Sequence, residues 1–557
     1  MHSKSSFLDW LYEFNVGGDD GELYAFGGSI LSFALEKMDM VNLCYAKGKG
    51  YVKQLKNSIY KLAKYPGLCM NHFYRNPQGT LKIEKKENSV VVSCGEHYIV
   101  ECFDNGTWHL MLDTCDGEFK GDLYHRAHGY PLWYMFYSRT LQKRFIKRLE
   151  TLKSHGYKHD DSALLEKLQE ENLIAASQAK MLCGIAETHL FTDTKQEYFP
   201  LGEDMHRRLL QDLESAEKFI YMEYFIIEEG KFWNSIMDIL KRKAAEGVEV
   251  KVLYDDIGCM MTLPGDYHKT LKTYGIEATP FSRLKGNADS EFNNRSHRKI
   301  TVIDGKVGYT GGVNIADEYI NEVVKYGHWK DTAIRLEGEA VWELTKLFLV
   351  DFGINVKKMP NVRDDLYPKT QITEHGYVIP FGDGPHPLYN RRVGKSVIQN
   401  MLNGATRYMW MTTPYLIIDN DLCQSIENAA LRGVDVRIIV PHIPDKKLIF
   451  AMTQSFYHRL MTAGVRIFEY EHGFIHAKSY LTDDKQAMIG TINLDYRSLV
   501  HHFENGVWMY DCETIKDLKM DMEDTLCKSI EVTPKMLKTN LLQRFIRAVV
   551  RIFAPML

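Results

Sequence analysis

Short runs of β-forming residues with apolar and polar positions interleaved follow one another between residues 81 and 112. Turn signals separate these runs, as in Asp104, Asn105 and Gly106 between the third and the fourth. Strands joined by such short turns pair antiparallel. The pattern therefore predicts an antiparallel meander over residues 81–85, 89–93, 97–103 and 107–112.

A charged stretch with helical periodicity follows over residues 139–178. It predicts helices that serve as a solvated connector. From Leu201 onward, apolar β-runs alternate with amphipathic helices. This alternation is typical of βαβ units and favours a mainly parallel sheet covered by helices.

The second pattern occurs twice along the chain. A strand at 220–227, a helix and a strand at 247–253 form the first copy, and residues 408–418 and 433–439 bound the second. The first strand of each copy ends in a matching tetrapeptide, Tyr-Phe-Ile-Ile or Tyr-Leu-Ile-Ile. Internal similarity of this kind predicts a duplicated α/β domain.

Each copy ends in the same constellation of polar residues. The first reads SHRKITVIDGKVGYTGGVN over residues 296–314, and the second reads IHAKSYLTDDKQAMIGTIN over residues 475–493. Both have the spacing H-x-K-x4-D, with an asparagine ten residues after the aspartate. One His-x-Lys pair is common by chance, whereas two copies with identical spacing are not. The candidate residues are His297, Lys299, Asp304 and Asn314 in the first copy, and His476, Lys478, Asp483 and Asn493 in the second.

The spacing indicates an anion site. Residues two apart on a strand point to the same face, so each imidazole is expected beside an ammonium group. The amides of Asn314 and Asn493 could donate to the same anion. A phosphate suits this set, because phosphoryl transfer depends on positioning and charge stabilisation.

The doubled motif resembles the signature of the phospholipase D superfamily. Within it, residues 198–557 resemble the bacterial cardiolipin synthases in segments such as NNRSHRKITVIDGKVGYTGGVNIADEY and IHAKSYLTDDKQAMIGTINLDYRSL. The resemblance implies that the two motifs meet across a pseudo-two-fold interface in one active site. One histidine would form a phosphohistidine and the other would protonate the leaving alcohol. By analogy with relatives, His297 is the expected nucleophile and His476 the expected acid and base, and no metal or cofactor is implied.

The same resemblance implies roles for further carboxylates. Asp331 and Glu504 lie where the family has acids that orient the active-site histidines, which would fix the tautomer of each ring. The aspartates of the two motifs are also candidate catalytic residues, although we expect each of them to hold a loop rather than to contact the substrate. Gly490-Thr491 stands where Gly-Ser is common in the family, and the hydroxyl is kept.

The implied domains are five. They are a β-rich N-terminal domain of unknown role (1–130), a helical connector (131–195), a first and a second phospholipase D-like repeat (196–365 and 366–530) and an amphipathic basic C-terminal helix (531–557).

The implied reaction joins two phosphatidylglycerol molecules into cardiolipin and releases glycerol. A phospholipid or nucleic-acid phosphodiesterase shares the same chemistry and remains open, as does a catalytically silent lipid-binding protein.

Composition and charge narrow these alternatives. Apolar residues make up 45% of the 557 and charged residues 25%, which excludes disordered and collagen-like chains. Nucleic-acid-binding domains are usually basic, so the net charge of −4 argues against nucleic acid. The ten cysteines show no C-x-x-C pair, which fits free thiols in a reducing compartment.

The relation to the membrane is predicted from two features. No run of 18 apolar residues occurs, although bacterial relatives usually carry N-terminal transmembrane helices. Residues 541–553 predict an amphipathic helix with Arg544, Arg547 and Arg551 on one face. We therefore expect a peripheral enzyme on the cytoplasmic face of the cell membrane, docked through this helix and the aromatic run at 132–137. Packing of either segment on the protein core is the alternative, and the sequence does not indicate an oligomeric state.

Overall fold

The chain forms two compact units, residues 1–142 and residues 143–557. The computed structural model describes five strands between residues 81 and 122 by their backbone. It further describes residues 145–151 except 149, and residues 159–537 except 284–293, 357–361, 369–371, 387 and 390. The aromatic run at 132–137 and the predicted C-terminal helix at 541–553 lie outside these ranges.

The first unit contains an antiparallel meander. Its strands pair in chain order, and they are β1 (Leu81–Lys86), β2 (Ser89–Cys94), β3 (His97–Asp104), β4 (Thr107–Thr114) and β5 (Gly117–Asp122). The four predicted strands are confirmed. The fifth, GEFKGD, was not predicted, because its two glycines and three charged residues give little β-propensity.

The first repeat of the second unit is built on a seven-stranded sheet. Its spatial order is β6 (Thr194–Phe199), β13 (Ala333–Gly338), β11 (Val307–Gly311), β10 (Lys299–Ile303), β7 (Phe219–Tyr224), β8 (Glu249–Asp255) and β9 (Glu277–Phe281). Only β7, β8 and β9 run parallel, and the other neighbours are antiparallel. The expected mainly parallel sheet is therefore wrong. A three-residue turn over 304–306, in which Asp304 and Gly305 have positive φ, joins β10 to β11, and so short a turn connects only antiparallel strands.

The second repeat reproduces this order and adds one edge strand. Its sheet runs β14 (Tyr377–Asp383), β23 (Glu504–Tyr510), β21 (Gln486–Gly490), β20 (Ser479–Thr482), β15 (Tyr408–Thr412), β17 (Asp435–Pro441), β18 (Arg466–Tyr470) and β24 (Ser529–Glu531). Strands β15, β17 and β18 are the parallel ones. The correspondence of strand order and direction confirms the predicted duplicated α/β domain.

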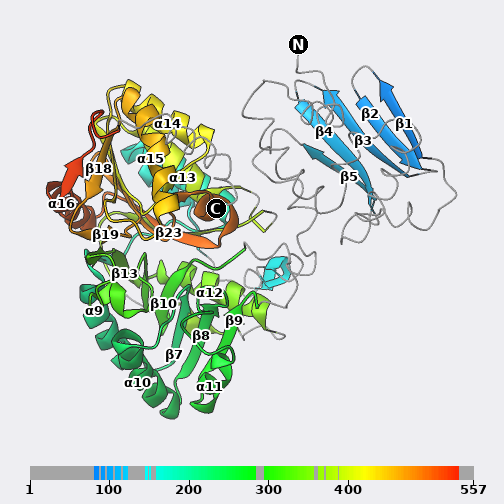
Figure 1. Ribbon diagram of the computed structural model, residues 1–557. Helices are drawn as coiled ribbons and strands as arrows, with labels where there is room; N and C mark the ends of the chain where they lie inside the picture. The colour runs from blue at the N-terminus through cyan, green and yellow to red at the C-terminus, as the bar shows by residue number, and fades with distance from the viewer. Residues whose placement is uncertain are drawn as a thin grey trace. The chain divides into compact units, whose positions relative to one another are not determined.

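Helices cover both faces of the first sheet, as the alternation along the central strand β7 shows. Ile220 and Met222 belong to the core that also contains Leu209 of α9 (Gly202–Glu214) and Leu240 of α10 (Lys231–Ala245). The ring of Tyr221 faces the other way and stacks on Phe348 of α12 (Val341–Asn355) at 4.8 Å. Helix α12 also packs on β14 of the second repeat. In Figure 1, α10 and α11 (Tyr267–Thr273) lie on the outer side of the first repeat, while α13 (Val393–Gly404), α14 (Asn420–Leu431) and α15 (Lys447–Thr462) cover the second.

The predicted connector is only partly solvated. Helices α7 (Ser162–Glu171) and α8 (Leu173–Ala186) occupy this part of the chain, and α8 packs on α13 and β14. Ala175, Ala179 and Leu182 are fully buried. Alanines let α8 approach the second repeat closely, so this helix is part of the fold and not a spacer.

The two repeats are joined by backbone pairing. Strand β12 (His328–Lys330) pairs parallel with β19 (Gly473–Ile475), and Ser296 forms a bridge with Phe503. Among the described residues, no helix combines the length and the apolar character that a bilayer crossing requires.

Candidate active site

Both motif histidines lie in the segments that lead into the hairpins β10–β11 and β20–β21. The backbone N–H of His297 donates to the carbonyl of Phe503 at 2.8 Å, and that of His476 donates to the carbonyl of Lys330 at 2.7 Å. Phe503 and Lys330 directly precede Glu504 and Asp331 in the chain. The backbone therefore places each histidine beside the acid of the other repeat.

The side chains form the corresponding crossed pairs. Nδ1 of His297 lies 3.0 Å from both carboxylate oxygens of Glu504, and Nδ1 of His476 lies 2.6 Å from Oδ2 of Asp331. Each acid follows the histidine of its own repeat in the sequence, so the exchange could not be read from residue order. A carboxylate on Nδ1 leaves Nε2 of each ring for chemistry.

Burial is the main influence on the two imidazoles. It lowers the pKa of His297 well below its ordinary value, against the opposing charge of Glu504, and lowers the pKa of His476 to about 4. Burial acts to raise the pKa of Glu504, but the His297 ring, through its attraction for the carboxylate and its Nδ1–H hydrogen bond, outweighs burial and holds that pKa low. Glu504 is thus an ionised partner of a neutral imidazole, and a neutral imidazole is the nucleophilic form.

The motif lysines are fully enclosed. Nζ of Lys299 donates to the carbonyl of His297 at 2.7 Å, and Nζ of Lys478 contacts the carbonyl of His476 and lies 2.8 Å from its Nδ1. Burial lowers the pKa of Lys299 to about 7 and that of Lys478 to about 8. The charge of Lys299 also depresses the pKa of His476, so both motifs share one electrostatic environment. A phosphodiester anion would favour the cationic form of both lysines.

The motif aspartates bind backbone N–H groups of loops that precede a central strand of each sheet. Asp304 accepts backbone N–H groups of Glu217, Lys218 and Phe219 at 2.7–2.9 Å. Asp483 does the same for residues 406–408 of the second repeat. These contacts agree with a loop-holding role, and participation of either aspartate in catalysis stays a prediction.

Replacing Asp304 with alanine is expected to cost about 2–4 kcal/mol of the free energy of unfolding, because three backbone donors lose their acceptor. Asparagine keeps one acceptor oxygen and tolerates the positive φ, so Asp304→Asn should lose less. Urea denaturation of both variants measures the difference. Full stability of Asp304→Ala combined with lost activity would contradict a loop-holding role.

The motif asparagines make contacts within their own repeats. Asn314 accepts the N–H of Ile226 at 3.1 Å and donates to the hydroxyl of Tyr319 at 2.8 Å. Nδ2 of Asn493 donates to Asp495 at 3.0 Å, and its buried Oδ1 has no hydrogen-bond partner among the residues that the structure describes. The NH₂ groups of both amides are thus engaged within their own repeats, and a direct role of either asparagine in phosphate binding stays a prediction.

Several residues at the site were not predicted. Arg298 is fully buried between the two motif residues and binds Asp351 at 2.7 Å and the carbonyl of Glu504 at 3.0 Å, which ties the two repeats together. The hydroxyl of Thr491 donates to Oε2 of Glu504. His502 packs on His297 with ring centroids 5.5 Å apart. The HHFENG segment contains this histidine, but only folding shows which of its two imidazoles faces the site.

Aromatic rings enclose the two histidines differently. Phe225 packs against His297 at 5.3 Å, whereas Trp329 and Tyr319 each pack against His476 at 5.5 Å. Such rings exclude water and strengthen the electrostatic interactions within the site. The two half-sites are therefore related in backbone but distinct in their surroundings.

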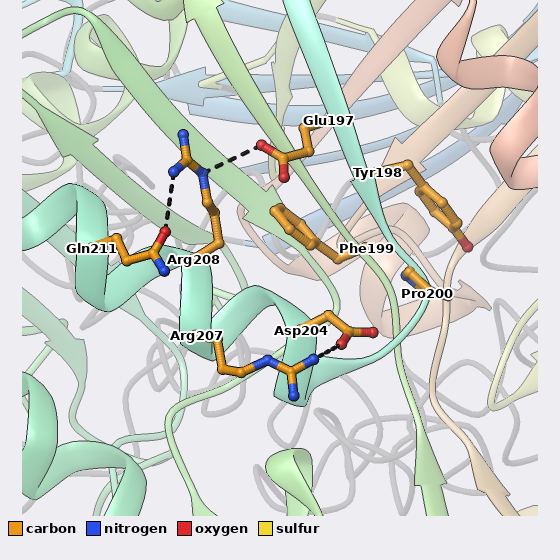
Figure 2. A pocket seen from close by; sticks show the side chains of 8 residues that line it. All are labelled: Glu197, Tyr198, Phe199, Pro200, Asp204, Arg207, Arg208 and Gln211. Atoms are coloured by element: carbon orange, nitrogen blue, oxygen red, sulfur yellow. Dashed lines mark hydrogen bonds and ion pairs between the residues drawn. The ribbon is translucent and has the colours of Figure 1, made fainter.

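A surface pocket of about 370 Å³ lies elsewhere, along β6 and α9 (Figure 2). Its arginines are paired: Arg207 contacts Asp204, and Nε of Arg208 lies 3.4 Å from Glu197. None of the motif residues lines it, so it is no part of the candidate site. The lining residues are Glu197, Tyr198, Phe199, Pro200, Asp204, Arg207, Arg208 and Gln211.

Comparison with known proteins identifies the family of the chain. The sequence model of the family described as cardiolipin synthase, PLD-like domain, matches residues 209–327 and 398–526. A cardiolipin synthase of Alkalihalophilus pseudofirmus is 36% identical over 375 residues, which are 67% of this chain and 72% of that protein. An uncharacterised protein of Streptococcus mutans is 42% identical over 75% of this chain and 90% of its own length.

A solved structure shares the fold. The crystal structure of phosphatidylserine synthase from Haemophilus influenzae matches 69% of this chain and 98% of its own, with a TM-score of 0.53 and 17% identity. Each of the two matched family segments contains one H-x-K-x4-D motif. The chain therefore belongs to the phospholipase D superfamily and, within it, to the cardiolipin synthase family of phosphatidyltransferase enzymes.

Proposed function

We propose that this enzyme transfers a phosphatidyl group from one phosphatidylglycerol molecule to a second, which forms cardiolipin and releases glycerol. The observation that carries the proposal is the crossed arrangement of two buried imidazoles, each held at Nδ1 by a carboxylate of the other repeat. Such a pair supplies a nucleophile and a proton donor to one phosphodiester.

In the first step, Nε2 of His297 attacks the phosphorus atom. The bond between phosphorus and the glycerol oxygen breaks, and His476, whose cationic form is favoured by Asp331 and by the bound phosphodiester anion, donates from Nε2 the proton that glycerol carries away. In the second step, the hydroxyl of a second phosphatidylglycerol gives its proton to His476 and attacks phosphorus, and the phosphorus–nitrogen bond breaks. Lys299 and Lys478 would balance the negative charge on the non-bridging oxygens in both steps.

The free energy of the reaction allows this exchange to proceed without an energy-rich co-substrate. One phosphodiester bond to a primary alcohol is broken and another of the same kind is formed, so the reaction is close to thermoneutral. A covalent phosphohistidine conserves the bond energy between the two steps. The two histidines and the two lysines of the motifs thus supply the groups that the transfer requires.

Hydrolysis is the alternative fate of the intermediate, because water can replace the acceptor hydroxyl. The motif lysines and the orienting acids are at most 1% exposed, and aromatic rings pack on both histidines. Restricted access of water favours transfer to an alcohol that is bound in place. This burial is the reason to prefer a transferase over a phospholipase D.

The test uses vesicles of phosphatidylglycerol labelled in the glycerol headgroup and in the acyl chains. The expected products are acyl-labelled cardiolipin and free labelled glycerol. We also propose that the enzyme docks on the cytoplasmic face of the cell membrane, and in that case it should float with the vesicles. Phosphatidic acid as the sole acyl-labelled product would instead indicate a hydrolase.

His375→Gln provides a matched control for this assay. His375 is 3.2 Å from the carboxylate of Asp511, at the end of the β14–β23 pair that lies opposite to Glu504. The substitution removes a histidine–carboxylate pair without affecting the candidate site, so the variant should retain full activity.

A further inference from the structure

His502 is a buried imidazole that the proposed reaction does not use. It follows the turn at 497–501, two residues before the start of β23, and it is 7% exposed. Its Nδ1 atom is buried and has no hydrogen-bond partner among the described residues. Nδ1 lies 3.6 Å from Oε1 of Glu504, the oxygen that is also 3.0 Å from Nδ1 of His297.

These three side chains present converging ligand atoms. The donor atoms of His297, His502 and Glu504 all lie within 4.8 Å of one another, and no other such trio of His, Cys, Asp or Glu occurs in the described part of the chain. Two imidazoles and a carboxylate are a ligand set that suits Zn²⁺, with the fourth tetrahedral position left open. We propose that His297, His502 and Glu504 bind a transition-metal dication of the Zn²⁺ class, and that this ion switches the active site off.

The spacing of the donor atoms fits such an ion. Metal–ligand bonds of about 2.0–2.1 Å in a tetrahedron place neighbouring ligand atoms roughly 3.4 Å apart. The observed separations of 3.0 and 3.6 Å bracket this value. The hydroxyl of Thr491 donates to Oε2 of Glu504, which leaves Oε1 directed at the two rings. Small shifts of the side chains therefore complete the coordination.

The chemistry of imidazole explains the inhibition. A neutral ring carries one proton, and in the free enzyme the Nδ1–H of His297 donates to Glu504. A metal ion bound to Nδ1 takes the place of this proton, and the single proton of the neutral ring then lies on Nε2. The Nε2 lone pair that would attack phosphorus is then absent. The ion also occupies the carboxylate that supports the cationic ring.

The site discriminates among metal ions and between the half-sites. Mg²⁺ and Ca²⁺ prefer oxygen ligands in larger coordination shells and are not expected to bind. His476 has Asp331 as its partner but is packed against Trp329, Tyr319 and Phe474, which offer no imidazole. Of the two half-sites, only that of His297 offers such a ligand set in the described part of the chain.

Binding is tested without lipid, so that its failure is distinguishable from failure of the proposed function. Calorimetry of the full chain with Zn²⁺ should show one tight site, which His502→Gln weakens roughly 100-fold or more and His375→Gln leaves unchanged. Co²⁺ as a spectroscopic probe should give the intense visible bands of a tetrahedral complex in the unmodified protein and in His476→Asn. Equal Zn²⁺ affinity of His502→Gln and the unmodified protein would overturn the site.

Inhibition, which rests on the proposed function, is measured against each protein's own metal-free rate. Zn²⁺ should inhibit cardiolipin formation by the unmodified enzyme and a chelator should restore it, while Mg²⁺ has no such effect. Should His502→Gln fail to fold, Zn²⁺-dependent protection of the unmodified enzyme from a histidine-directed reagent at His502, located by peptide mapping, decides the question. Modification of His502 at the same rate with and without Zn²⁺ would contradict the proposal.

Discussion

Replacing His297 with alanine is expected to abolish the covalent phosphoenzyme, whereas replacing His476 is expected to leave it detectable. His297 is the proposed nucleophile, so its loss removes the atom that bonds to phosphorus. Loss of His476 removes the proton donor for glycerol and the base for the acceptor, which slows formation and decay of the intermediate by about 10²–10⁴-fold each. Both variants should lose cardiolipin formation by roughly 10³-fold or more.

The phosphoenzyme is trapped by denaturing the protein in alkali after brief incubation with phosphatidylglycerol labelled at phosphorus. Phosphohistidine survives in alkali, so label that remains with the denatured chain reports the intermediate. The expected result is label on His476→Ala and none on His297→Ala, with His375→Gln equal to the unmodified enzyme. Label on His297→Ala that is lost from His476→Ala would exchange the two roles.

Local sequence patterns predicted the parts of this site that depend on local geometry. The H-x-K-x4-D spacing places His297 just before a strand and Lys299 at its first position, and the Asp304 turn that follows closes the hairpin. The duplication of this pattern then predicts a second, equivalent half. These features depend on neighbouring residues, and for that reason they could be read from sequence.

The direction of the strands and the pairing of the acids could not be read in the same way. Alternating strands and helices correctly indicate the parallel trio β7, β8 and β9, but the hairpin strand β10 returns antiparallel to β7 and sets the mixed character of the sheet. The contact between His297 and Glu504 spans 207 residues and depends on the register at Phe503. No spacing along the chain records such a register.

His502 shows the same limitation at the level of one side chain. Residues 501 and 502 are both histidines, and the sequence gives no reason to prefer either. A turn of π-helical form at 497–501 directs His502 toward Glu504. Turns of this kind are rare and often occur at functional sites, but they have no reliable sequence signature.

Exchanging Glu504 for glutamine should impair His297 alone, and exchanging Asp331 for asparagine should impair His476 alone. Each substitution keeps the shape of the side chain and removes its charge. Loss of a carboxylate behind a catalytic imidazole costs about 10⁴-fold in turnover in a comparable hydrolytic triad, and we expect losses of about 10³–10⁴-fold here. Turnover by itself does not identify the pairing, because either loss disables the shared site.

Nitrogen NMR of ¹⁵N-histidine-labelled protein identifies which acid is paired with which histidine. Burial lowers the pKa of His297 while the charge of Glu504 opposes this effect, so Glu504→Gln should lower that pKa further and weaken support for the positive charge that develops as nitrogen bonds to phosphorus. The Nδ1 signal of His297 should move in Glu504→Gln, and that of His476 in Asp331→Asn, because these are the pairs in contact. The opposite assignment would mean that each acid serves its own repeat. In that case the backbone bonds from His297 to Phe503 and from His476 to Lys330 would have to break, since they fix the crossed register.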